Sequence, residues 1–472
     1  MLSEEAYQRE QDLLDEVRQK SPELFARSPF IDDDRVFQII GIEGVFPTDR
    51  PVGYLRLFPS DFIVEEIAEN GKVRTVELAT NKQISGTGPN IYADLVKAGM
   101  STLDAKRALA RHWNIEEKYI RHAGIKDRFA ITSQRISIRH ATDEQVLGAS
   151  FPGKLFLKNI SRGHGIITIG KLQGNRFTIV VRVPHALSDN QGEALGARVA
   201  QIGREGFWNF FYTQRFGTPR LITHLQGLCL FTRQYEEGVK MCLTYLSPYD
   251  LPYFNELRKQ ALGRWGDWEA IFKLLSPFPM HFPSELALLA HLRKHPTDFV
   301  GALHATSEET RIWAYAYASY LFNRKLSGLI RDHASIPEVL PLITSFRAED
   351  WDEYREFTQA DGVELDPRVA EELPFVRAEV PTWPTRQKAI VHSFAANGDL
   401  AVLSFSLPKG SYATSFLSNF FILASDMPIV PGVSTMIVDA KKMLGEGNLV
   451  REFEYFDSAL ASRKEEIKKG FA

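Results

Sequence analysis

The sequence predicts an α+β fold in which a block of helices interrupts a strand-rich domain. Stretches of β-branched residues with alternating polarity, at 90–99 and 175–183, predict strands in the first half of the chain. After residue 220 the pattern becomes helical, and the strand pattern returns in DLAVLSFSLP at 399–408. Because strands lie on both sides of the helices, we expect one sheet with a helical insertion.

The other elements follow from the same two periodicities and from local start signals. Ser101 followed by Asp104 is typical of a helix N-cap, and this helix is expected to run through Arg111. In chain order, the remaining patterns predict a helix at 3–20, a strand, turn and strand at 53–67, strands at 134–140 and 165–172, and helices at 234–246, 254–263, 268–275, 284–295 and 309–333.

Composition places the chain among soluble globular proteins of two or three domains. It has 472 residues, of which 44% are hydrophobic and 24% charged. Two cysteines, Cys229 and Cys242, are too few for a disulfide framework, which favours a reducing cytoplasm. Residues 1–25 lack the apolar core of a secretory signal, and no stretch is apolar enough to span a bilayer.

Charge is unevenly distributed although the formal net charge is only -3. Residues 101–182 contain 15 lysines and arginines but six aspartates and glutamates, whereas residues 348–373 are strongly acidic. An excess of cations of this size is what binding to nucleic-acid phosphates requires. A solvated basic surface without a partner is the alternative.

Asp127 lies within this basic stretch, in the segment AGIKDRFAITSQ at 123–134. From the residues alone it could cap a turn, since Gly124 precedes it and an alternating strand pattern follows. The spaced residues Gly124, Lys126, Asp127, Ala130, Thr132 and Gln134 give the pattern G-x-K-D-x-x-A-x-T-x-Q. Four further segments accompany it in order: PSDFIVEEI at 59–67, GNRF at 174–177, NFFYTQRFG at 209–217 and LPKGSYAT at 407–414.

These five segments resemble those of the TruD family of pseudouridine synthases. The resemblance implies an α+β catalytic domain with a mainly antiparallel sheet, interrupted by an inserted, largely helical TRUD domain. The expected division is an N-terminal helical extension at 1–48, the catalytic domain at 49–219 and 377–450, the inserted TRUD domain at 220–376, and a C-terminal tail at 451–472.

The resemblance also implies a reaction and a substrate. Uridine becomes pseudouridine when the bond from C1′ to N1 of the base breaks, the base rotates, and C1′ joins C5. The family's usual target is uridine 13 of tRNA, and we expect no cofactor, metal, membrane or obligate protein partner. A single ionised carboxylate, assigned by the resemblance to Asp127, acts either as nucleophile at C1′ or as base at C2′.

A uridine in folded RNA must leave its stack to be reached, so the enzyme is expected to flip it out. By resemblance, Phe177 contacts the flipped base, and Asn175 holds the base or the carboxylate by hydrogen bonds. Phe62 and Tyr412 are expected to complete the pocket wall. Lys126, beside the aspartate, favours the ionised carboxylate and can bind a phosphate.

Four further residues are expected at the substrate. Gln214, Arg215 and Phe216 shape the pocket and the sugar-phosphate contact by resemblance. Arg56 occupies a position where the family tends to have a basic residue, and is expected to anchor a phosphate.

Three alternatives remain open. The chain could be a catalytically idle RNA-binding or RNA-chaperone protein that keeps the pocket, or it could modify another RNA or another position. An RNA-cleaving or base-removing glycosidase would need a second acid, for which Glu65 and Glu66 are the candidates.

Overall fold

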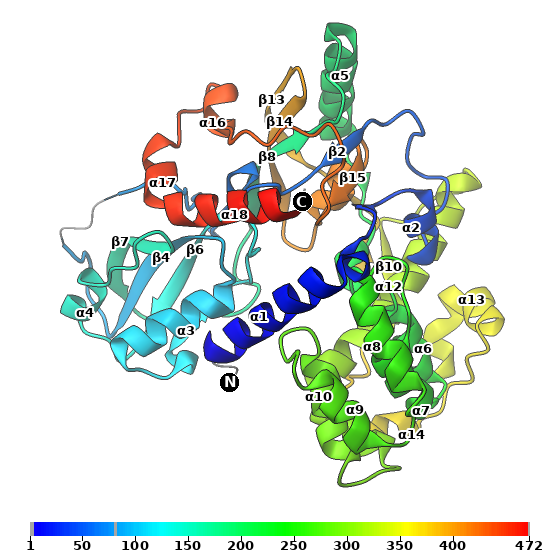
Figure 1. Cartoon of the computed structure of the whole chain (residues 1–472). Coiled ribbons are helices and arrows are strands. Elements are labelled where there is room, and N and C mark those ends of the chain that lie inside the picture. The colour runs from blue at the N-terminus through cyan, green and yellow to red at the C-terminus, as the bar shows by residue number, and fades with distance from the viewer. Residues whose placement is uncertain (1–3, 80–82, 471–472) are drawn as a thin grey trace. The chain divides into compact units, whose positions relative to one another are not determined.

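The computed structural model describes residues 4–79 and 83–470 and divides the chain into two compact units (Figure 1). The first, called the helical unit, contains residues 1–45 and 210–385. The second, called the sheet unit, contains residues 46–209 and 386–472. Each unit is therefore built from two separate stretches of the chain.

The helical unit has a single extended core, lined by Leu230, Leu257, Leu288 and Leu321 among others. Gly227 lets two of its helices approach closely, because a Cβ there would meet the backbone oxygen of Trp313. No helix in the described ranges has both the length and the apolar character needed to cross a bilayer. Its elements are α1 (Glu4–Lys20), β1 (Phe30–Ile31), α2 (Asp34–Ile39), α6 (Thr223–Phe231), α7 (Tyr235–Thr244), α8 (Pro252–Leu262), α9 (Trp268–Leu275), α10 (Pro283–Leu292), α11 (Phe299–Ala305), α12 (Ser307–Arg331), β10 (Val339–Pro341), α13 (Arg355–Ala360), α14 (Arg368–Glu372) and β11 (Thr382–Pro384).

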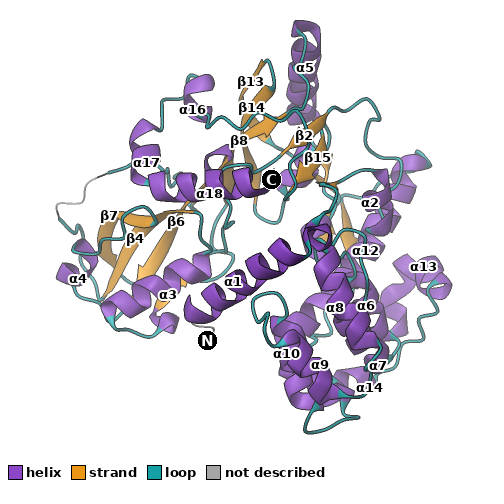
Figure 2. Ribbon diagram, in the orientation of Figure 1, coloured by secondary structure: helices purple, strands orange, loops and turns teal. Residues whose placement is uncertain are grey.

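The sheet unit is built around one large twisted sheet (Figure 2). Its elements are β2 (Val52–Tyr54), β3 (Phe62–Ile67), β4 (Asn90–Ala98), α3 (Thr102–Trp113), β5 (Ile120–His122), β6 (Ile131–Ile138), α4 (Asp143–Leu147), β7 (Leu155–Gly163), β8 (Gly174–Arg182), α5 (Asp189–Glu205), β9 (Phe207–Trp208), β12 (Arg386–Gln387), β13 (Ile390–Asn397), β14 (Leu400–Pro408), α15 (Ala413–Leu417), β15 (Ile422–Ser425), α16 (Ala440–Met443), α17 (Val450–Tyr455) and α18 (Asp457–Gly470).

Most strand pairs in this sheet are antiparallel. The strands follow the order β15-β2-β8-β3-β6-β4-β7, and β14 pairs with both β8 and β13. Only β15–β2 and β3–β6 are parallel among these described pairs. The late strand β14 lies directly against β8 along its full length, from Leu400 opposite Arg182 to Pro408 opposite Gly174. The expected α+β fold with a mainly antiparallel sheet is thus confirmed, and residues more than 200 positions apart share one sheet.

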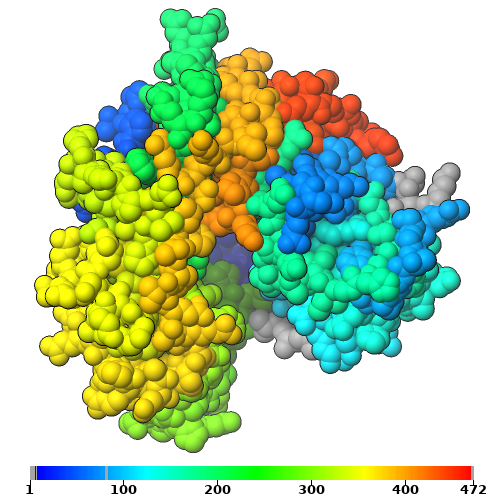
Figure 3. Space-filling model, turned by 180° about the vertical axis from the view of Figure 1, so that it is seen from behind, coloured from blue at the N-terminus to red at the C-terminus, as the bar shows by residue number. Residues whose placement is uncertain are grey.

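Helices cover parts of both faces of the sheet. On one face, Ile63, Ile131 and Val180 pack into a cluster with Leu449 and Phe456, the residues that flank α17. On the other face, α3 covers β4, β6 and β7 at one end of the sheet. At the opposite end α5 packs against β13, and Figure 3 shows the green side chains of α5 beside the orange hairpin β13–β14. The part of the second face near β3 and β8 carries the polar residues considered below.

The predicted strands at 90–99, 175–183 and 399–408 are confirmed, as is the Ser101 cap of α3. The strand predicted at 165–172 is wrong, because β7 ends at Gly163 and the following residues form turns. Gly165 and Gly170 both have positive φ angles, of 82° and 84°, which interrupt an extended chain. The isoleucine pattern was misleading because Ile169 is 74% exposed rather than packed.

Candidate active site

Asp127 lies in the connection between the antiparallel strands β5 and β6, and its side chain is 46% exposed. Side chains from two neighbouring elements hold this connection. Gln134 of β6 donates to the carbonyl oxygen of Gly124 (2.9 Å), and the Thr102 hydroxyl of α3 donates to Gln134 Oε1 (2.9 Å). The Lys126 backbone N–H donates to the same hydroxyl oxygen (2.9 Å). The glycine and glutamine of the motif therefore fix the backbone that presents the carboxylate.

Lys97 of β4 also holds the connection between β5 and β6. Its side chain is fully buried, and its ammonium group donates to the backbone oxygens of Met100 (2.7 Å) and Asp127 (2.8 Å). Burial lowers the pKa of Lys97 to about 7, while the charge of Asp127 opposes this shift. The lysine therefore ties the backbone of the candidate catalytic aspartate to the sheet.

The strand registers bring polar and aromatic residues to one face of the sheet, which we call the site face. Val64 of β3 pairs with Phe177 of β8 and with Thr132 of β6, and Thr132 pairs in turn with Lys97 of β4. Paired residues project to the same side of a sheet, and so do alternate residues of one strand. Asn175, two residues before Phe177, therefore lies on the site face as well.

Arg56 connects the aspartate to a row of aromatic rings. Its Nη1 lies 3.5 Å from Asp127 Oδ1, and its guanidinium carbon lies 4.9 Å from the centroid of the Phe62 ring. Phe62 meets Phe177 edge to face at 6.1 Å, and Phe177 stacks on Phe405 at 5.3 Å. Arg56 has a φ of 57°, a left-handed conformation that costs a non-glycine residue about 1 kcal/mol. Strain of this kind is concentrated at functional sites, so the backbone of Arg56 is consistent with a functional site here.

Lys126 faces inward, away from the carboxylate beside it. It is buried, and its ammonium group forms an ion pair with the equally buried Glu66 (3.4 Å). Burial lowers the pKa of Lys126, and the charge of Glu66 opposes that shift. Its ammonium group is therefore not on the surface where a phosphate would bind. Among the described residues, Arg56 is the cation that contacts the Asp127 carboxylate.

Some buried oxygens on the site face have no hydrogen-bond partner among the described residues. Asn175 Oδ1 and Thr132 Oγ1 are buried and lack a hydrogen bond within the described residues. A buried polar atom without a partner is costly unless a ligand or water satisfies it. Tyr412 is half-buried and immediately precedes α15, in the segment that follows β14.

The structure does not bring Gln214, Arg215 and Phe216 together with Asp127 in one unit. They form a short turn of the helical unit, whereas Asp127 belongs to the sheet unit. Phe216 is fully buried against His224, whose pKa is lowered to about 3 by burial. Within its own unit, this phenylalanine is a core residue.

Comparison with known proteins identifies the family of the chain. The model of the family described as tRNA pseudouridine synthase D (TruD) matches residues 42–351, which is more than half of the chain. The chain belongs to the TruD family. A relative from Methanopyrus kandleri is 31% identical over 353 residues, which cover 71% of this chain and 86% of that protein. A Geobacter relative, named tRNA pseudouridine synthase D, is 28% identical over 79% of this chain and 97% of its own.

A solved structure supports the fold of this TruD-family chain. The crystal structure of a TruD protein from Methanosarcina mazei superposes with a TM-score of 0.63 and covers 81% of this chain and 97% of that one. At 23% sequence identity, this likeness concerns the fold alone.

Sequence reasoning did not single out Lys97, and it named Glu66 only as one of two candidates for a second acid of a glycosidase. Lys97 lies among the apolar residues Leu95, Val96 and Ala98 of β4, and its charge there was the available signal. The strand register was needed to show that Glu65 and Glu66 lie on opposite sides of the sheet. Glu65 faces the opposite side of the sheet, where it pairs with Lys441 (2.8 Å).

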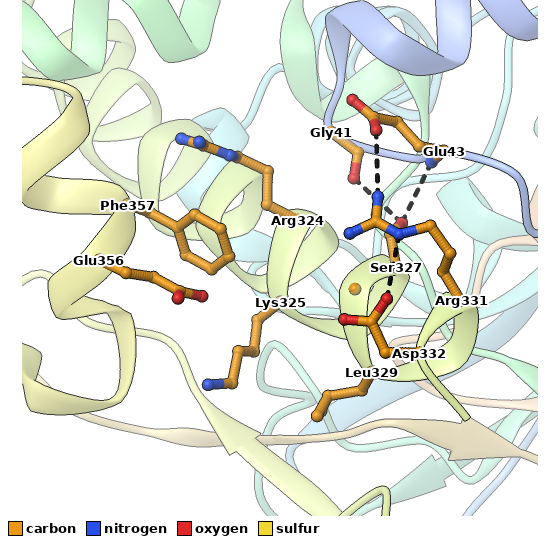
Figure 4. Close-up of a pocket in the computed structure, with 11 residues that line it drawn as sticks. Gly41, Glu43, Arg324, Lys325, Ser327, Leu329, Arg331, Asp332, Glu356 and Phe357 are labelled. Carbon is orange, nitrogen blue, oxygen red and sulfur yellow. Dashed lines mark hydrogen bonds and ion pairs between the residues drawn. The ribbon is translucent and has the colours of Figure 1, made fainter. Parts of the chain in front are cut away.

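The helical unit of this TruD-family chain contains a separate pocket of about 420 Å³ (Figure 4). The Arg331 guanidinium contacts Glu43 (3.4 Å) and Asp332 (3.2 Å) at its edge. Ser327 donates to the Gly41 carbonyl oxygen (3.1 Å) and accepts from the Glu43 backbone N–H (3.2 Å). These charged and polar groups are paired with one another. They differ from the site face, where Asp127 and Arg56 lie beside a row of aromatic rings.

Proposed function

We propose that the protein converts uridine to pseudouridine in tRNA, with position 13 as the target and Asp127 as the catalytic carboxylate. The observation that carries this proposal is the position of Asp127: an exposed carboxylate, in the family motif, beside a guanidinium group and a row of aromatic rings. The reaction breaks the C1′–N1 bond and forms a C1′–C5 bond. The proton of C5 is lost and N1 gains a proton, so no electrons are exchanged with another reactant.

Several side chains have positions suited to this reaction. Arg56 contacts the carboxylate of Asp127 and, with its side chain 24% exposed, leaves part of its guanidinium group available to a phosphate. Phe177 is only 7% exposed, so a flipped base would reach only a small part of this residue. The unpaired Asn175 Oδ1 can accept a hydrogen bond from the N–H of uracil.

The buried pair Lys126–Glu66 argues against a glycosidase that releases free base. Such an enzyme needs a second carboxylic acid to protonate the leaving base. Glu66 lies on the site face, but its carboxylate is buried and held in an ion pair with the ammonium group of Lys126, so it is poorly placed to reach a leaving base. Glu65 faces the other side of the sheet.

We also propose a division of the chain into domains and a cellular location. Grouping residues 46–209 with 386–472 supports one catalytic domain interrupted by an insertion, with boundaries near the proposed 49–219 and 377–450. A cytoplasmic location is proposed because tRNA is available there.

The test is to incubate the purified protein with unmodified tRNA and to map pseudouridine by carbodiimide-dependent primer-extension stops. Asp127→Asn removes the charge with little change of shape, and Asp189→Asn is a matched control because Asp189 is an exposed carboxylate of the same unit. We expect a stop at position 13 for the wild type and the control, and none for Asp127→Asn, whose tRNA binding is retained.

The outcomes separate the alternatives. Substantial conversion by Asp127→Asn would refute the assignment of the catalytic carboxylate. A stop at another nucleotide would keep the chemistry and exclude position 13. Binding without any conversion by the wild type would favour the catalytically idle RNA-binding protein, and release of free uracil would favour the glycosidase.

A further inference from the structure

Arg463 of the C-terminal helix α18 contacts two segments of the chain, one that contains Arg56 and one that contains Asp127. Arg463 Nε donates to the backbone oxygen of Leu57 (2.9 Å), the residue after Arg56. The guanidinium carbon of Arg463 also lies 5.5 Å from the ring centroid of Phe129, two residues after Asp127. Arg463 therefore joins two segments that are separated by about 70 residues in the chain.

The geometry of Arg463 is itself fixed. Its side chain is only 13% exposed, and its Nη1 donates to Glu466 one turn later on α18 (2.8 Å). A planar guanidinium group held in this way can donate along its edge while its face lies on an aromatic ring. Both contacts can thus be satisfied by a single orientation.

The segment that Arg463 holds is the strained one. Arg56 adopts a left-handed backbone, and the residues on both sides of it are anchored. The Leu55 N–H donates to the Ala424 carbonyl oxygen (2.8 Å), and the Leu57 carbonyl accepts from Arg463. Since a strained conformation persists only where its surroundings determine it, loss of the second anchor should let Arg56 relax.

We propose that Arg463 is a positioning residue for the Arg56–Asp127 pair, which makes α18 part of the frame of the active site. This helix lies outside residues 42–351, the part of the chain matched by the family model. The inference rests on the proposed function, because its consequence is measured as pseudouridine formation.

The experiment compares Arg463→Gln with Lys464→Gln in steady-state pseudouridine formation on tRNA. Lys464 is the exposed neighbour on the same helix, so the control removes the same charge without the two contacts. For Arg463→Gln we expect kcat to fall between about 10-fold and 100-fold, because small displacements of reacting groups have effects of this size. We expect KM to change by less than about 2-fold, and Lys464→Gln to match the wild type.

Two more variants distinguish positioning from general stability. Arg463→Lys keeps the charge but not the planar group, so its kcat should lie between those of the wild type and Arg463→Gln. Phe129→Leu removes the ring contact at a side chain that is 46% exposed, and it decides the matter if Arg463→Gln does not fold. It should lower kcat at unchanged KM.

A kcat for Arg463→Gln equal to that of Lys464→Gln, or a folded Phe129→Leu variant with wild-type kcat, would overturn the inference. A wild-type protein that forms no pseudouridine would instead refute the proposed function. The two failures are therefore distinguishable.

Discussion

The buried charge of Lys97 predicts a measurable dependence of stability on pH. The pKa of this lysine falls from the ordinary value of 10.5 to about 7, chiefly because burial disfavours the ammonium form. Nearby charges also change the pKa of Lys97: Asp127 and Asp104 raise it, and Lys126 lowers it. At about 1.4 kcal/mol per pKa unit, this difference between 10.5 and about 7 corresponds to roughly 5 kcal/mol.

The sign follows from the number of protons bound by each state. Below pH 7 Lys97 is protonated in both the folded and the unfolded chain, and the fold bears the full cost of the buried charge. Between about pH 7 and 10.5 only the unfolded chain keeps the proton, so the free energy of unfolding rises with pH. The contribution is complete above 10.5 and is lost as the pH falls through 7.

Lys97→Met should remove this dependence while filling the same space. The measurement is the free energy of unfolding in urea for both proteins at several pH values from 7 to 10. We expect the value for the wild type minus that for the variant to increase by about 1.4 kcal/mol per pH unit. Lys464→Met, at an exposed position, should give a difference that does not vary with pH.

A wild-type-minus-Lys97→Met difference that stays constant across this pH range would refute the reasoning. It would mean that Lys97 has the same proton affinity in the folded and the unfolded chain. Its buried position would then not carry the electrostatic cost derived above.

Two further predictions concern buried groups elsewhere. Asp61 and Arg182 are both fully buried and joined by two hydrogen bonds (2.9 and 2.7 Å), so Asp61→Asn should lower the free energy of unfolding in urea by about 3 to 5 kcal/mol; a loss below about 1 kcal/mol would contradict this. Burial raises the pKa of Cys229 to about 11 and that of Cys242 to about 12, so neither thiol should react with a disulfide reagent at pH 8 until urea unfolds the chain; rapid labelling of the folded protein would disagree.

The sequence was most informative where local pattern and burial coincide. Strands β4, β8 and β14 are rich in apolar residues and are buried in the sheet, so the sequence pattern predicted them correctly. The isoleucines at 166–169 have a similar pattern, but glycines on either side of them turn the chain. Periodicity reports which residues could form a strand, whereas backbone conformation and available partners determine whether they do.

Motif spacing suggested candidate residues for the site but not their neighbours across the sheet. Phe177 and Thr132 are far apart in the chain, and only the shared pairing with Val64 places them on one face. The contacts made by Lys97 and Arg463 depend likewise on elements that meet only in the folded chain. Spacing along one strand predicts orientation, but register between strands is set by long-range pairing.

The cation beside the carboxylate illustrates this limit. Sequence adjacency favoured Lys126 as the group that stabilises an ionised Asp127, yet successive residues of an extended segment point in opposite directions. Ile125 and Asp127 are accordingly exposed, while Lys126 between them is buried against Glu66. The guanidinium group that meets the carboxylate comes from Arg56, 71 residues earlier. An adjacent residue in such a segment is therefore poorly placed to assist its neighbour, and the assisting charge has to come from another element.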